Sequence, residues 1–202
     1  MVDPLCPERL AEDAVYLGVL TARGVKPLSR LEYPVAPRVL ELLGGMGLIM
    51  ADVTRIAGEV PGSVAGVPSQ VIHLILSRDA RLMDRYGADF DGQPLCGETD
   101  AVVRLEARYF GYPACCAEAY IRSPHAENGL AAEDQALLFH RACPGCAATL
   151  QMIPLYRAAL AEVQRQRHLF LPLAAPSGAP SAAWSQHSAG SRTRRERRPD
   201  RW

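Results

Sequence analysis

Four of the six cysteines of this 202-residue chain fall within the 32 positions 115–146, and this cluster constrains the fold more than any other feature. The four cysteines form two groups, Cys115-Cys116 and Cys143-Pro-Gly-Cys146. Six cysteines are too few for the disulfide scaffold of a secreted domain of this size. We therefore expect the fold to join two segments of the chain at one cysteine site.

Charge is divided unevenly along the chain. Basic and acidic residues both number 22, so the formal net charge is zero, and 49% of the residues are hydrophobic. This composition argues against a uniformly basic nucleic-acid binder and against a highly charged disordered chain. Residues 174–202 carry six arginines against two acidic residues, a net charge of +4, which leaves −4 on residues 1–173. We expect a single compact domain over 1–173, with the cysteine motifs in 99–165, and a disordered basic Pro/Ser/Arg-rich tail over 174–202.

The chain shows no sign of a secretory signal or a membrane span. The first 13 residues are acidic where a signal peptide would be basic. The uncharged stretches 60–77 and 168–191 are each interrupted by prolines, so neither offers a continuous apolar run. We expect a cytoplasmic protein that does not enter the membrane, and in that compartment thiols stay reduced.

Hydrophobic spacing predicts a largely helical chain. A short branched run, Val71 to Leu76, is the best candidate for a strand, and residues 47–53 fit either a strand or a buried helix. Pro154 is expected to kink or split the long helical pattern that follows Cys146. The fold class expected is mostly α-helical, with an α+β fold carrying a small sheet in the N-terminal half as the alternative. Helices are expected over residues 7–24, 38–43, 79–86, 99–111 and 131–140, from Pro113 onward, and after Cys146.

Each group of cysteines has a chemistry of its own. In the C-x-x-C group, Pro144 and Gly145 favour a turn that lets both thiols face one ion, and His140 lies three positions ahead with an imidazole to offer. Cys115 and Cys116 fall in the opening turn of a helix, where free N–H groups stabilise thiolate. Adjacent helical residues point about 100° apart, which argues against both binding the same ion. The candidate metal ligands are Cys115, Cys116, Cys143, Cys146 and His140.

The spacing leaves the bound group open. Zinc sites usually use two spaced pairs, and here one pair has no spacer, whereas an iron–sulfur cluster accepts irregular spacing. Zinc and an iron–sulfur cluster therefore both stand as cofactors. A thiol–disulfide oxidoreductase that uses the C-P-G-C pair is an alternative, although that motif normally follows a strand rather than a helix. The cysteines could also serve only as small buried apolar residues.

Together, G-Y-P-x-C-C at 111–116 and H-x-x-C-x-x-C at 140–146 resemble a prokaryotic family filed as a domain of unknown function. The similarity covers roughly residues 100–160, and Ala114 stands where that family often has Glu. The resemblance implies that the four cysteines and His140 form the functional centre. It implies no established activity, substrate or cofactor.

Other polar residues are expected to play lesser parts. Cys6 and Cys96 are expected to be free thiols outside the site, and Glu106 and Glu118 to be exposed helical carboxylates. The arginines of 192–201 offer a weak contact for nucleic acid or another anionic partner, which makes an interaction module a further alternative.

Overall fold

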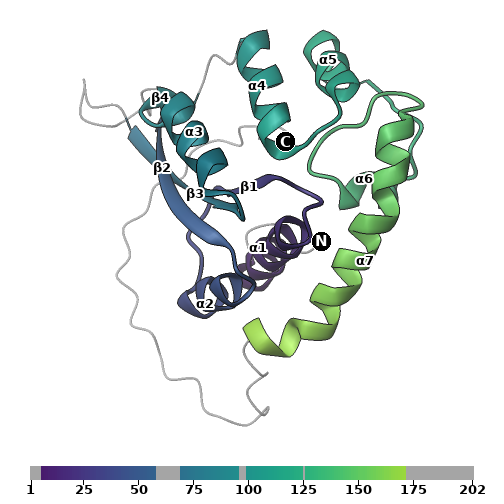
Figure 1. The fold of residues 1–202 in the computed structure, drawn as a ribbon. Coiled ribbons are helices and arrows are strands. Elements are labelled where there is room, and N and C mark those ends of the chain that lie inside the picture. The colour runs from purple at the N-terminus through teal and green to yellow at the C-terminus, as the bar shows by residue number, and fades with distance from the viewer. Residues whose placement is uncertain (1–5, 58–68, 96–98, 125, 172–202) are drawn as a thin grey trace, which may run out of the picture.

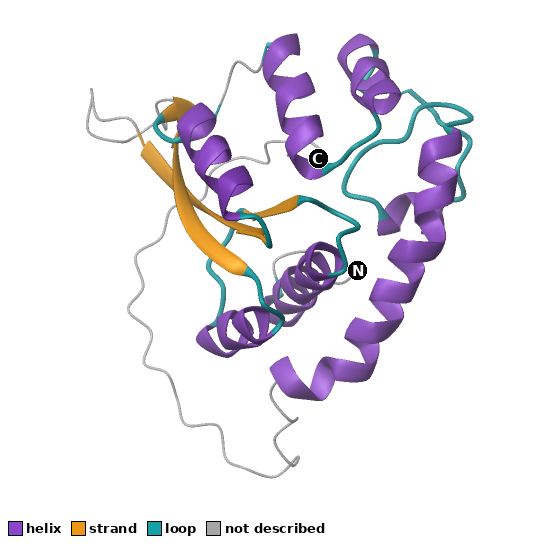
Figure 2. Ribbon diagram, viewed as in Figure 1, coloured by secondary structure: helices purple, strands orange, loops and turns teal. Residues whose placement is uncertain are grey.

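The structure is a computed structural model, and it describes residues 6–57, 69–95, 99–124 and 126–171. These residues form a mostly helical fold around a small four-stranded mixed sheet in the N-terminal half, which confirms the expected class (Figure 2). The predicted tail, with its arginines at 192–201, lies outside the described residues. The helices are α1 (Pro7–Ala22), α2 (Pro37–Gly45), α3 (Ala80–Phe90), α4 (Asp100–Phe110), α5 (Ala114–Arg122), α6 (Ala132–Leu137) and α7 (Ala147–Phe170). The strands are β1 (Leu28–Leu31), β2 (Ile49–Ala57), β3 (Ser69–Ser77) and β4 (Gln93–Pro94).

The sheet has the strand order β1-β3-β2-β4. Strand β3 pairs antiparallel with both β1 and β2, and β2 pairs parallel with β4. Side chains alternate between the two faces of a strand. On β3, His73 and Ile75 therefore face one side, while Leu74 and Leu76 face the other. Because both faces are covered near Ile75 and Leu76, this part of β3 reads in the sequence as a continuous apolar run.

Helices cover both faces of the sheet (Figure 1). On one face, Val53 and Ile75 join a buried cluster with Tyr86 of α3 and Phe110 of α4. On the other face, Leu76 joins the larger cluster, to which α1, α2 and α7 contribute. Helix α7 packs along α1, so the C-terminal helix is anchored to the N-terminal one.

Several helix ends fall where the sequence predicts them. Thr99 caps α4 by accepting a hydrogen bond from the backbone N–H of Val102 at 3.4 Å. Gly111 ends α4 in the left-handed region, with φ of 72°. A Cβ atom at this position would lie 2.6 Å from Cδ of Pro27, so glycine is required both by the backbone conformation and by the close packing.

Two helices differ from the expectation, and in a third the split that Pro154 could have caused does not occur. Helix α3 continues past Gly87 to Phe90, because burial of the Phe90 side chain outweighs the roughly 1 kcal/mol that a helical glycine costs. Helix α6 spans only Ala132–Leu137, so His140 is not helical. Helix α7 runs through Pro154 without a break. The carbonyl that would have bonded to Pro154 belongs to Leu150, a half-exposed residue at the solvent side of the helix.

None of the helices among the described residues has the length and hydrophobicity needed to cross a membrane.

Candidate metal centre

Two helix starts carry three of the four clustered cysteines. Cys115 and Cys116 occupy the first turn of α5, as expected, and the N–H of Cys116 donates to the carbonyl of Pro113 at 2.9 Å. Cys146 is the N-cap of α7, and its sulfur accepts a hydrogen bond from the N–H of Thr149 at 3.4 Å. The Cys143 side chain comes from the turn before α7. Both helix N-termini therefore point positive dipole ends toward the sulfur atoms.

The fold brings the four cysteines together. Their Sγ atoms all lie within 4.8 Å of one another, and the four residues remain free thiols without a disulfide. The Sγ of Cys146 lies 3.5 Å from the Sγ of Cys115 and 3.5 Å from that of Cys116. Adjacent positions on α5 thus do not prevent both thiols from reaching one centre, because Cys146 approaches them together. Four sulfurs at these separations can hold a metal ion.

The thiols ionise unequally. Burial opposes ionisation of Cys146, but hydrogen bonds from the hydroxyl and the N–H of Thr149, and from the thiols of Cys115 and Cys116, outweigh it and lower the pKa of Cys146 to about 6. Burial, with hydrogen bonding to the neighbouring sulfurs, raises the pKa of Cys143 to about 12. Burial also raises the pKa of Cys116. The cluster therefore stabilises the thiolate of Cys146 by itself, whereas the raised pKa values of Cys116 and Cys143 mean that a bound cation would favour their ionisation.

His140 stands one side chain away from the sulfurs. Its Nε2 lies 3.1 Å from Oγ1 of Thr149, and that oxygen lies 3.5 Å from Sγ of Cys116. The imidazole is buried and packs on the ring of Tyr112, with 5.0 Å between the ring centroids. Burial, assisted by the positive charge of Lys26, lowers the pKa of His140 to about 4. His140 is therefore neutral at neutral pH and contacts the cysteine cluster through Thr149.

The GYP part of the first motif supports the cluster. Gly111 allows α4 to end against Pro27, Tyr112 covers the His140 ring, and Pro113 provides the carbonyl that accepts from Cys116. Each of these three residues therefore has a structural role where α4 ends and α5 begins.

Sequence reasoning misplaced one carboxylate. Glu106 is buried, not exposed, and its Oε1 accepts hydrogen bonds from Arg30 at 2.7 Å and from Arg55 at 3.0 Å. Its position three residues after the buried Val103 puts it on the face of α4 that meets the sheet, and that spacing was the available signal. Glu118 does lie at the surface, where it pairs with Arg104.

Of the two remaining cysteines, Cys6 lies among the described residues and outside the cluster. Cys6 is a free, partly exposed thiol before α1, as expected. Cys96 lies outside the described residues.

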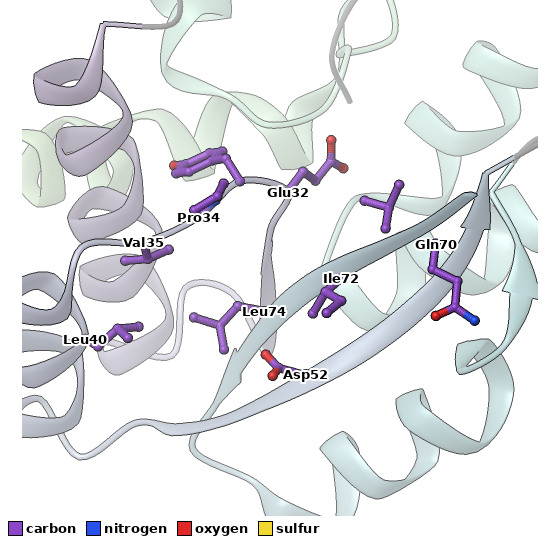
Figure 3. A pocket seen from close by; sticks show the side chains of 10 residues that line it. Glu32, Pro34, Val35, Leu40, Asp52, Gln70, Ile72 and Leu74 are labelled. Carbon is purple, nitrogen blue, oxygen red and sulfur yellow. The ribbon is translucent and has the colours of Figure 1, made fainter. Parts of the chain in front are cut away.

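A groove of about 520 Å³ lies elsewhere on the molecule. Figure 3 shows Ile72 and Leu74 of β3 facing Val35 and Leu40 across it, with Asp52 beside Leu74 and Gln70 farther along the sheet. The walls are mainly apolar, and no clustered cysteine belongs to them. The groove and the cysteine cluster are therefore separate features.

Comparison with known proteins assigns no relative: no family model matches the chain, and neither a curated protein nor a solved structure matches it. The chemistry of the site must therefore be argued from its own geometry.

Proposed function

We propose that this protein binds one zinc ion through Cys115, Cys116, Cys143 and Cys146, and that the ion holds the start of α5 against the start of α7. The proposal is carried by one observation, the convergence of four free thiols within 4.8 Å.

The sulfur separations favour a single ion over a cluster. Tetrahedral zinc with Zn–S bonds of about 2.3 Å holds its sulfurs about 3.8 Å apart. The separations of 3.5 Å from Cys146 to Cys115 and to Cys116, and the 4.8 Å limit for the whole set, bracket that value. In a cubane iron–sulfur cluster each cysteine binds a different iron, which requires the sulfurs to stand farther apart. Zinc therefore fits with less rearrangement.

The donor set favours a structural role over a catalytic one. A catalytic zinc usually keeps one position open for water, whereas four thiolates fill a tetrahedral ion. His140 then acts as an outer partner, since its Nε2 reaches Thr149 rather than the sulfur atoms. Outer partners of this kind orient the ligands of a metal.

Metal analysis of the full chain purified anaerobically tests the proposal. We expect one zinc per chain, no acid-labile sulfide and no visible absorption. Cys146→Ser should lose the metal, while Cys6→Ser, a matched change of a free thiol outside the cluster, should keep it. If iron and acid-labile sulfide were found, an iron–sulfur cluster would be bound in place of zinc. If the protein were metal-free with unchanged stability, both the zinc and the cluster would be excluded.

A second candidate, a thiol–disulfide oxidoreductase, is favoured by the lowered pKa of Cys146 and by its distance of 3.5 Å from the exposed Cys115. A stable thiolate beside an accessible partner thiol is the arrangement that disulfide exchange uses. Exchange activity in the metal-free chain that Cys115→Ser and Cys146→Ser both abolish would support this function. Full activity in the Cys143→Ser variant would exclude the C-P-G-C pair.

Two broader proposals rest on the sequence. Membership of the prokaryotic family that the two motifs resemble is proposed from residues 111–116 and 140–146. A cytoplasmic location is proposed because a zinc–thiolate site requires reduced cysteines.

A further inference from the structure

Lys26 is the single lysine of the chain, since the other 21 of its 22 basic residues are arginines. It is also one of the most deeply buried side chains, with 1% of its surface exposed. Arginine stays protonated in proteins, whereas a buried lysine can lose its proton and act as a nucleophile. Lys26, which unlike the arginines can lose its proton, is therefore buried away from bulk water.

The Lys26 ammonium has few polar partners. Its Nζ donates to the carbonyl of Phe110 at 3.1 Å and lies 4.3 Å from the centroid of the Tyr112 ring. Among the described residues no carboxylate forms an ion pair with it. Burial, together with the nearby guanidinium of Arg30, lowers the pKa of Lys26 to about 7. A large share of the protein therefore carries a neutral amine here at neutral pH.

A cavity of about 40 Å³ adjoins Lys26. Arg30 and Glu32 contribute its charged groups, and the side chain of Glu32 is about half exposed. A water molecule needs about 10–15 Å³ of such space, so the cavity admits a molecule of only a few non-hydrogen atoms. Its other walls are apolar or aromatic: Leu17, Phe110, Tyr112 and Phe139.

We propose that Lys26 is an amine nucleophile that binds the carbonyl carbon of a small aldehyde or oxo acid in this cavity as an imine. The neutral amine nitrogen forms a C=N double bond to the carbonyl carbon and gives up its two protons, the carbon–oxygen bond breaks, and the oxygen leaves with both protons as water. No oxidant or reductant is needed. The Glu32 carboxyl, in the wall of the cavity, is placed to exchange the protons. Arg30 pairs with Glu32 and Glu106, and its guanidinium also lines the cavity, where it can attract the carboxylate of an oxo acid. The site does not depend on the proposed zinc.

Reductive trapping tests the proposal on the unaltered full chain. The protein is treated at pH 7 with glyoxylate, or with the neutral glycolaldehyde, in the presence of cyanoborohydride, and the adduct is located by peptide mapping. Because Lys26 is the only lysine, the N-terminal amine is the sole other primary amine. We expect an adduct on Lys26 with at least one aldehyde. Faster trapping with glyoxylate would assign the oxo acid, and equal trapping would assign small aldehydes in general.

The Arg85→Lys variant provides a matched amine at an exposed position of α3. Lys26 should be trapped at least about tenfold faster than the introduced amine at pH 7, because an ordinary lysine is almost fully protonated there. In urea, which removes the cavity, the two amines should react alike. No adduct on Lys26, a rate no faster than that of the introduced amine, or an advantage that persists in urea would each overturn the proposal.

Discussion

The sheet-containing half and the cysteine region are held together by different means. In the former, fully buried side chains such as Leu20, Leu43 and Leu76 pack into an extensive core on both faces of the sheet. Around the cysteines, the buried cluster found among the described residues consists of Cys116, Ala142 and Cys146, with the partly buried Leu130, Leu138 and Cys143 packed against it. Apolar burial contributes about 25 cal/mol of stabilisation per Å² of buried surface. This contribution is therefore small in the cysteine region.

This contrast indicates that the thiols contribute to the stability of the cysteine region. Helix α5 is short, α6 has no buried residue, and much of 123–146 lacks regular structure. Segments of that kind remain ordered when a ligand or metal joins them. The difference supports the proposal that a metal would stabilise the region in which the chain provides little apolar core, and each prediction below changes one of the two regions.

The largest effect is expected from removal of the metal. Cys146→Ser should lower zinc affinity by more than about 100-fold, since even the loss of an outer partner costs about 10- to 100-fold, and a strong chelator should remove the ion from the unaltered chain. Hydrogen exchange followed by mass spectrometry should then show lost protection over 114–150 and retained protection in β2 and β3. Cys6→Ser is the control. Equal loss of protection in both regions would show that the ion is needed by the whole fold.

The second prediction changes the apolar core and leaves the cysteine region unaltered. Leu20→Ala, at a fully buried position, should lower the free energy of unfolding by about 2–5 kcal/mol through lost burial and the cavity left behind. Thermal unfolding measures the loss, and zinc content should stay at one per folded chain. Leu150→Ala, at a half-exposed position, should cost far less. A comparable cost at both positions would contradict the assigned role of the core.

These two regions were not equally predictable from sequence. The capped helix from Thr99 to Gly111 and the strand around Ile75 followed from local signals, because capping and apolar runs depend on neighbouring residues. The approach of Cys146 to Cys115 and Cys116 was suspected from motifs but argued against by helix geometry. It is decided by how α7 packs on α1, which no local pattern contains.

Buried polar groups were the least predictable. Glu106 looks like any helical carboxylate until Arg30 of β1 and Arg55 of β2 are placed beside it. Lys26 had a signal in its rarity, but its burial depends on Phe110 and Tyr112, more than 80 positions away. Such sites are made by tertiary contacts, so sequence periodicity does not reveal them.

A third prediction concerns charge at the boundary between the regions. The pKa of Lys26 is lowered from 10.5 to about 7 by burial, so above pH 7 the unfolded chain binds more protons than the folded chain. Stability from this group therefore rises with pH between about 7 and 10.5 and is lowest below pH 7. Lys26→Met should stabilise the protein most at pH 6, by a few kcal/mol, and the gain should shrink toward pH 10 in urea titrations. A constant gain across this range would mean that Lys26 does not titrate as described.

The smallest and most selective effect is expected from a Thr-to-Val substitution made separately in each region. Thr149→Val keeps the shape of the side chain but removes the hydroxyl that touches His140 and Cys116, so zinc affinity should fall about tenfold. Thr21→Val removes a buried hydroxyl bonded to Leu17 and Ser29, and should cost about 1 kcal/mol of stability with zinc affinity unchanged. Competition with a chromophoric chelator measures the affinity, and urea unfolding measures the stability. If both variants changed zinc affinity equally, the cysteine region would not be energetically separate from the sheet, because the Thr21 hydroxyl bonds to Leu17 and Ser29 and the four clustered cysteines are not its partners.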